Sequence, residues 1–250
     1  MHISVDSVTK KYGKITVLDQ VSIDFRQGGC YCIIGVNGAG KSTLFNLLMQ
    51  YIKAETGEIL YDTHRFQVLP AAYKQRMGYL SEPLNILEEL SVNQYLDFTG
   101  KLYGVAPALL QDRKERILQF LFEDQEEIGK KRIAVLSTGM KKKVAFAGAI
   151  LHSPEFLLLD EPFSALDPVS AKKICNFLSG YLNEKRTIVF SSHNLEYLEA
   201  INPIIIILDD AKVKYNAPLA EFTSNHSQSI SQSLMEKLKV NDSSTVMQWD

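Results

Sequence analysis

The sequence predicts an α/β protein with a parallel β-sheet at its core. Three observations indicate this fold class: short apolar runs of strand length, helical patterns between them, and a glycine-rich loop that joins one such run to a helix. Of the 250 residues, 46% are hydrophobic and 22% are charged, which is typical of globular chains with a sizeable core. The net charge of −2 argues against a protein that coats nucleic acid, because such proteins carry a basic surface.

The first part of the chain predicts antiparallel strands and then a buried strand. Apolar and polar residues alternate from Ile3 to Phe25 around a turn at Gly13. The run from Cys30 to Ile34 is apolar throughout, as expected of a strand that is covered on both faces. A glycine-rich loop follows from Gly35 to Gly40, and leucines at helical spacing predict a helix from Ser42 to Tyr51.

The region from about Asn85 to Glu127 has helical spacing, many charges and few strand signals, so we interpret it as a mostly helical insertion. After it, apolar strand-like runs alternate with helical patterns, which is typical of a parallel sheet. The predicted strands are 156–159, 187–190 and 204–208, and the predicted helices between and after them are 169–182 and 195–200.

Membrane and redox signals are weak in this sequence. No apolar run reaches the roughly 18 residues of a membrane span. The first residues lack the basic and apolar segments of a secretory signal, so we expect none. Three cysteines, Cys30, Cys32 and Cys175, are interpreted as small core residues and not as a disulfide or metal site, which indicates a reducing, cytoplasmic compartment.

The end of the chain differs from the rest in composition. Five serines lie between Ser224 and Ser233, and a second polar stretch follows from Asn241 to Thr245. We interpret residues 224–250 as a polar tail with one short helix at Leu234 to Val240.

The strongest chemical signal is a phosphate-binding loop after the buried strand. The sequence Gly35-Val-Asn-Gly-Ala-Gly-Lys41-Ser42-Thr43 matches the pattern G-x-x-x-x-G-K-[ST] and precedes a predicted helix. Glycines let successive backbone N–H groups surround a phosphate, and the helix start adds positive potential. Lys41 would contact the β and γ phosphates and the Ser42 hydroxyl would bind Mg²⁺. The candidate binding residues are Gly35, Asn37, Gly38, Ala39, Gly40, Lys41, Ser42 and Thr43.

Two acids end the predicted strand at 156–159. Carboxylates at the carboxyl edge of a parallel sheet lie where ligands bind in open α/β folds. Asp160 would hold Mg²⁺, and Glu161 would take the proton from an attacking water. The alternative for an isolated pair is a solvated strand end, which the nearby phosphate loop disfavours.

A second helix start follows Leu136. Ser137, Thr138, Gly139 and Met140 precede the lysines 141–143 and a compact apolar helix. Backbone N–H groups at this start, with the lysines, would attract an anion. Taken alone, the segment is more often an ordinary helix cap with a basic first turn.

Together these motifs resemble the nucleotide-binding domain of ABC (ATP-binding cassette) proteins, from about Ile3 to Phe222. The resemblance implies a P-loop NTPase fold with a RecA-like parallel-sheet core, an N-terminal antiparallel β subdomain and a helical subdomain. It divides the chain into a cassette at 1–223, with the helical subdomain at about 85–140, and the tail at 224–250. The resemblance also implies that Tyr12 stacks on adenine, although an exposed strand tyrosine is the alternative.

Further roles are implied by the same resemblance. Ser164 to Asp167 matches the D-loop, and Asp167 is its acidic residue. His193 follows the strand at 187–190 and matches the histidine that contacts the γ-phosphate. The other histidines, His2, His64, His152 and His226, match no motif and are expected to be surface or incidental residues.

Two positions depart from the commonest family pattern. Glu82 stands where glutamine is usual, and with Ser42 and Asp160 it completes the expected Mg²⁺ ligands. The signature reads Leu-Ser-Thr-Gly-Met, so Thr138 and Met140 replace glycine and glutamine. Both variants resemble a group of ABC exporters whose ATPase and membrane parts are separate chains.

The resemblance implies an ATPase that uses ATP and Mg²⁺ and belongs to an exporter. Two cassettes, expected to be a homodimer, would close on ATP, with the residues 137–140 acting on the nucleotide of the other chain. A separate transmembrane permease would hold the chain at the inner face of the membrane, with no direct nucleic acid contact. The expected permease contact is Glu82 to Gln94, where Pro83, Leu84, Ile86 and Leu87 offer apolar area; core packing is the alternative.

Three other functions agree less well with the sequence. A soluble ABC ATPase that remodels a ribosomal or nucleic-acid complex usually has two cassettes or a long coiled-coil insertion, which this sequence does not show. A regulatory ATP-binding module would not need Asp160, Glu161 and His193 together. A P-loop kinase would need neither the segment at 136–143 nor the one at 191–193.

Overall fold

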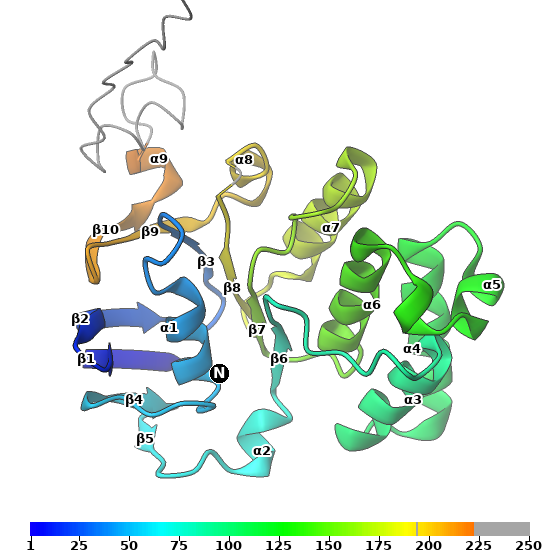
Figure 1. The fold of residues 1–250 in the computed structure, drawn as a ribbon, viewed down its shortest axis with the longest axis horizontal. Coiled ribbons are helices and arrows are strands. Elements are labelled where there is room, and N and C mark those ends of the chain that lie inside the picture. Colours follow the sequence, from blue (N-terminus) through cyan, green and yellow to red (C-terminus); the bar gives the residue numbers. More distant parts are fainter. Residues whose placement is uncertain (194, 223–250) are drawn as a thin grey trace, which may run out of the picture.

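A computed structural model describes residues 1–193 and 195–222, and these form two β-sheets with a group of helices beside them (Figure 1). The predicted tail at 224–250, with its short helix and His226, lies outside the described residues. None of the described helices has both the length and the apolar character that a membrane crossing requires.

The first sheet is antiparallel and has the strand order β2-β1-β4-β5. Its predicted hairpin is confirmed: Ile3 pairs with Phe25, and the turn passes through Gly13 at a φ of 60°. The strands β4 and β5 were not predicted, because β4 is half-exposed and β5 is two residues long. The strands of this sheet are β1 (Ile3–Tyr12), β2 (Ile15–Phe25), β4 (Thr56–Tyr61) and β5 (His64–Arg65).

The second sheet has the order β10-β9-β3-β8-β7-β6. All neighbours are parallel except β9 and β10, which are antiparallel, so the predicted parallel core is confirmed and gains an antiparallel edge. The strand β10 was not predicted, because exposed and half-buried residues alternate along it and it has no continuous apolar run. The strands are β3 (Cys30–Ile34), β6 (Met77–Leu80), β7 (Phe156–Leu159), β8 (Thr187–Ser191), β9 (Ile204–Asp209) and β10 (Lys212–Pro218).

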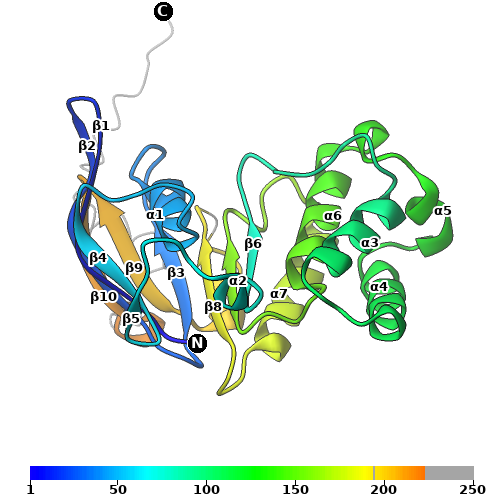
Figure 2. The same cartoon turned by 90° about the horizontal axis from the view of Figure 1, so that it is seen from below.

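The two faces of the second sheet bury different sets of residues. On one face, Tyr31 and Ile33 of β3 join the apolar side of α1 (Lys41–Leu48) and the first sheet. Figures 1 and 2 show α1 between the two sheets. On the other face, Cys30 and Cys32 pack against the helices, with Cys175 in the same cluster. All three cysteines are buried and unpaired, as predicted.

The helices between residues 92 and 181 gather at one side of the second sheet (Figure 2). The region predicted to be helical from Asn85 begins its first helix only at Val92, where Ser91 and Gln94 form a capping box. The later predicted helix at 195–200 also starts late, because residues 196 and 197 form a turn before it. The helices are α2 (Ala71–Lys74), α3 (Val92–Leu102), α4 (Pro107–Leu121), α5 (Gln125–Lys130), the 3₁₀ turn η1 (Ile133–Val135), α6 (Thr138–Ile150), α7 (Pro168–Tyr181), α8 (Leu198–Ile201) and α9 (Leu219–Phe222).

Candidate active site

The loop between β3 and α1 requires glycine at two positions. Gly40 caps α1 at a φ of 101°, and a Cβ there would lie 2.8 Å from the carbonyl oxygen of Val17. A Cβ at Gly35 would lie 2.4 Å from the carbonyl oxygen of Leu208. The loop is therefore pressed against β2 and β9, with its backbone free to surround a ligand.

Lys41 begins α1 and is buried at the loop. Its ammonium donates hydrogen bonds to the carbonyl oxygens of Gly35 at 2.7 Å and Val36 at 3.3 Å. A pocket of about 250 Å³ opens here. It is lined by Val17, by 37–43 of the loop and helix start, and by Glu82, Asp160 and Glu161. All of the predicted loop residues except Gly35, and all three predicted acids, therefore meet at one pocket.

Asp160 ends β7 with one oxygen satisfied and one not. Oδ1 accepts a hydrogen bond from the Ser191 hydroxyl at 2.6 Å, whereas Oδ2 is buried without a partner among the described residues. Burial raises the pKa of Asp160 and the charge of Glu161 adds to this rise, while the Ser191 hydrogen bond, the nearby Ser42 hydroxyl and the charge of Lys41 oppose it. An orphaned carboxylate oxygen next to a hydroxyl suits a hard cation.

These residues fit Mg²⁺. Within 1–193 and 195–222, no three histidines, cysteines or acids are placed to enclose a metal. Mg²⁺ does not need such a cage, since it keeps several waters and takes phosphate oxygens with one or two carboxylates. Asp160 and Ser42 would hold the ion, with Glu82 as a further predicted ligand.

Glu161 lies beside the predicted histidine. The His193 Nδ1 is 2.8 Å from the Glu161 Oε2, and the backbone N–H of Glu161 donates to the Ser191 hydroxyl at 2.8 Å. Glu161 has a φ of 49°, a conformation that is unusual outside glycine. The Ser191 hydroxyl thus holds both acids of the site.

Two residues of the site escaped sequence reasoning. Val17 lines the pocket from β2, but its alternating strand context gives no signal of a ligand. Ser191 was part of the motif at 191–193, yet only His193 received a role. Its position at the end of β8, next to β7, is the signal that would have found it, because adjacent parallel strands end at one edge.

Glu82 reaches the pocket from the loop after β6, and its Oε2 accepts a hydrogen bond from the buried ammonium of Lys142 at 2.5 Å. The sequence placed Glu82 at this site, but it treated Lys142 only as part of a basic helix start.

The signature residues lie elsewhere. None of the residues 137–140 lines the phosphate pocket. Ser137 caps α6 by accepting a hydrogen bond from the Met140 N–H at 3.3 Å, and a Cβ at Gly139 would lie 2.7 Å from the Ala165 carbonyl oxygen. Asp167 caps α7 in a similar way, accepting from the Ser170 N–H at 2.9 Å. The binding roles of Ser137, Thr138, Gly139 and Met140 stay predictions.

Tyr12 is at the end of β1 and is 50% exposed, with the Lys10 ammonium 5.3 Å from its ring centre. It is not among the residues that line the phosphate pocket, so its stacking on adenine stays a prediction.

Among the unassigned histidines, His152 has a packing role. It is half-buried, stacks on Tyr103 with ring centres 3.7 Å apart, and bonds to the Met77 carbonyl oxygen. Burial lowers the pKa of His152 to about 4, so the ring is neutral at physiological pH. The sequence around His152 does not predict this packing, because Tyr103, at the end of α3, and Met77 of β6 are far away in the sequence.

The fold and this pocket define a P-loop nucleotide-binding protein. The sequence profile of the ABC transporter family matches residues 18–164, more than half of the chain. The chain therefore belongs to the ABC transporter family, and it is an ATP-hydrolysing enzyme.

Known proteins resemble the chain over most of its length. The ABC transporter ATP-binding protein NatA of Bacillus subtilis is 29% identical over 90% of this chain and 91% of its own. The bacitracin transport ATP-binding protein BcrA of Bacillus licheniformis is 30% identical over 86% and 69%. A solved ATP-binding subunit of an ABC transporter superposes with a TM-score of 0.86 at 25% identity, covering 95% of this chain and 99% of that one. The dimeric post-hydrolysis cassette MJ0796, bound to ADP and Pi, gives a TM-score of 0.78 at 25% identity over 87% and 98%.

Proposed function

We propose that this chain is the ATPase subunit of an exporter and drives a separate transmembrane permease. The observation that carries the proposal is the pocket where the phosphate loop faces Asp160 and Glu161. The printed names of relatives support transport, since they include bacitracin transport and Nod factor export ATP-binding proteins.

The pocket residues divide the chemistry among them. Lys41 and the loop N–H groups bind and orient the β and γ phosphates. Ser42 and Asp160 would hold Mg²⁺, which would supply neutralisation of the charge that develops on the transferred phosphoryl group. Glu161 takes the proton of the attacking water, and His193 holds the Glu161 carboxylate in place through Nδ1.

The working unit is a dimer in which each nucleotide is bound by two chains. Ser137 and Gly139 of one chain bind the γ-phosphate held by the loop of the other. Their position outside the chain's own pocket supports this arrangement, as does the dimeric form of the related cassette MJ0796. Hydrolysis removes the phosphate that joins the chains, so the dimer opens and can move its partner.

The permease contact is proposed at the cleft between the sheet core and α3. Leu84 and Ile86 pack against the core, whereas Leu87 stays 43% exposed and Pro83 is exposed. Core packing therefore accounts for two of the four apolar residues considered, and the contact area left is smaller than expected.

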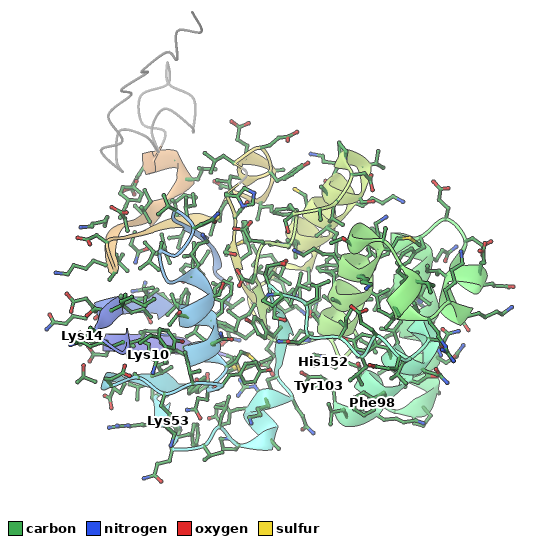
Figure 3. All side chains as sticks on the ribbon, viewed as in Figure 1. Lys10, Lys14, Lys53, Phe98, Tyr103 and His152 are labelled. Carbon is green, nitrogen blue, oxygen red and sulfur yellow. The ribbon has the colours of Figure 1, made fainter. Side chains whose placement is uncertain are left out.

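Two further exposed apolar side chains are aromatic. Tyr51 and Phe98 are 58% and 49% exposed, and Figure 3 shows Phe98, Tyr103 and His152 in the region of α3. Burial raises the pKa of Tyr103 and the nearby hydroxyls of Tyr51 and Tyr95 add to the rise, so Tyr51, which follows α1, lies near Tyr103 at the end of α3. A permease segment that binds here would hold the chain at the cytoplasmic face of the membrane.

Co-purification tests the proposal. The tagged chain is isolated from its native cell in mild detergent, with a Leu87→Asp, Phe98→Asp variant as the matched control. We expect a polytopic membrane protein at stoichiometric amount with the native chain and its loss with the variant. Ribosomes or nucleic acid in place of a membrane protein would favour the soluble remodelling ATPase.

A further inference from the structure

Lys142 is a buried cation that the proposed reaction does not use. Its side chain is 2% exposed in the middle of α6. A lysine is rarely buried without a charged partner, because an unpaired ammonium loses its hydration. Its neighbours Lys141 and Lys143 are more exposed, at 20% and 16%, and pair with acids other than Glu82.

The Lys142 ammonium joins three segments at the ATP site. It donates hydrogen bonds to the Glu82 Oε2 and to the Ser164 hydroxyl, both at 2.5 Å. Ser164 in turn donates to the Glu161 carbonyl oxygen at 3.0 Å. One buried cation of the signature helix therefore contacts a pocket acid directly and the backbone of the catalytic acid through one hydroxyl.

The charges in the pocket explain why the contact between Lys142 and Glu82 matters for nucleotide binding. Glu82, Asp160 and Glu161 all line a pocket whose loop binds phosphates, and Lys41 is the cation among its lining residues. A free carboxylate at Glu82 would repel a nucleotide, since like charges a few ångströms apart interact strongly near a protein surface. Lys142 lies behind Glu82 at hydrogen-bond distance and offsets its charge.

We propose that Lys142 is a positioning residue for nucleotide binding: it holds and neutralises Glu82, so that the pocket accepts ATP with a carboxylate where an amide is usual. Because only Oε2 is bound among the described residues, the other carboxylate oxygen stays available to a ligand. The same pair ties α6, which carries the signature residues, to the pocket. This inference does not depend on the permease or on export.

Metal-free ATP binding tests the pair without turnover. ATP affinity is measured by calorimetry in EDTA and again with Mg²⁺, for Lys142→Gln, Lys142→Arg and the double variant Glu82→Gln, Lys142→Gln. We expect Lys142→Gln to lose about tenfold in affinity without metal, which corresponds to about 1.4 kcal/mol. Mg²⁺ should reduce that loss to about threefold, since the cation screens the phosphates. Lys142→Arg should bind as the native chain does.

The double variant and a second buried lysine keep the test decisive. Removing both charges should restore metal-free affinity to within about threefold of the native chain, because no carboxylate is left to neutralise. Lys114→Gln, at a buried lysine of α4 that pairs with Asp97 away from the pocket, should leave affinity unchanged. A double variant that binds no better than Lys142→Gln, or a loss that is equal with and without Mg²⁺, would overturn the proposal.

If Lys142→Gln does not fold, Glu82→Gln replaces it. Glu82→Gln should bind metal-free ATP at least as tightly as the native chain and should melt at a lower temperature. The double variant should recover the melting temperature. Weaker metal-free binding by Glu82→Gln would contradict the proposal.

Discussion

The chain has two helix starts suited to an anion, at α1 and at α6, and they differ in what surrounds them. At α1, Lys41 bonds only to loop carbonyls and faces Asp160 and Glu161 across a pocket. At α6, the basic side chains are occupied locally: Lys141 pairs with Glu88 at 2.7 Å and Lys142 with Glu82.

The α1 pocket is lined by groups of a single chain, whereas the α6 surface would need a second chain to form a site. At α1, a cation, a glycine-rich loop, a carboxylate suited to a metal ion and the proposed base lie together. At the α6 end the backbone is capped by Ser137, the lysines are paired with acids, and none of the residues 137–140 lines the phosphate pocket. Changes at α1 should therefore act within each chain, and changes at the signature residues 137–140 only through a partner. The predictions below run from the largest expected effect to the smallest.

Glu161→Gln should abolish turnover and keep ATP binding. The amide matches the carboxylate in shape but cannot take a proton, so kcat should fall by about 10²- to 10⁴-fold. Phosphate release and equilibrium ATP binding, measured on one preparation, separate the two effects. Turnover within a few-fold of the native rate would exclude Glu161 as the base.

Lys41→Ala should weaken ATP binding itself. Charge-assisted hydrogen bonds contribute about 1.5–3 kcal/mol, so affinity should fall by about 10- to 100-fold. Lys14→Ala, in the exposed turn between β1 and β2, is the matched control and should bind normally. Equal affinity for both variants would refute the phosphate-loop assignment.

Ser191→Ala should slow hydrolysis by about tenfold, since it removes one hydrogen bond from each acid of the site and leaves buried groups unsatisfied. The variant should also shift the acid limb of the pH profile of hydrolysis to higher pH. Burial already raises the pKa of Asp160 and the Ser191 hydrogen bond opposes that rise, so its loss raises the pKa further. Protonated Asp160 binds Mg²⁺ poorly, and activity is therefore lost at a higher pH. Ser179→Ala, on α7, is the control; an unchanged profile in Ser191→Ala would contradict the assignment.

Tyr12→Ala should have the smallest effect of the series. Loss of one aromatic stack is worth about 0.5–1.5 kcal/mol, or about two- to tenfold in ATP affinity. Tyr12→Phe keeps the ring and should bind normally. If Tyr12→Ala also binds normally, Tyr12 is simply an exposed strand residue.

Sequence reasoning succeeded where the chemistry is local to one segment. The loop at 35–43 and the acids that follow β7 are contiguous motifs whose residues need each other at fixed spacing. The pairing of Lys142 was missed because its partner Glu82 is 60 residues away in the sequence. The packing of His152 was missed for the same reason, since Tyr103 and Met77 come from distant parts of the sequence. The strands β4, β5 and β10 were missed because none of them is a continuous buried run: β4 and β10 are partly exposed, and β5 has two residues.

Mixing two inactive variants tests most directly whether the two helix starts belong to one shared site. Lys41→Ala disables the loop and keeps the signature face; Gly139→Val disables the face, where a Cβ would meet the Ala165 carbonyl oxygen, and keeps the loop. Each alone should be inactive, and an equal mixture should regain about a quarter of native activity, because half of the symmetric dimers then hold one intact composite site of two. A mixture as inactive as its components, with both variants folded by circular dichroism and dimeric by light scattering, would contradict the shared site.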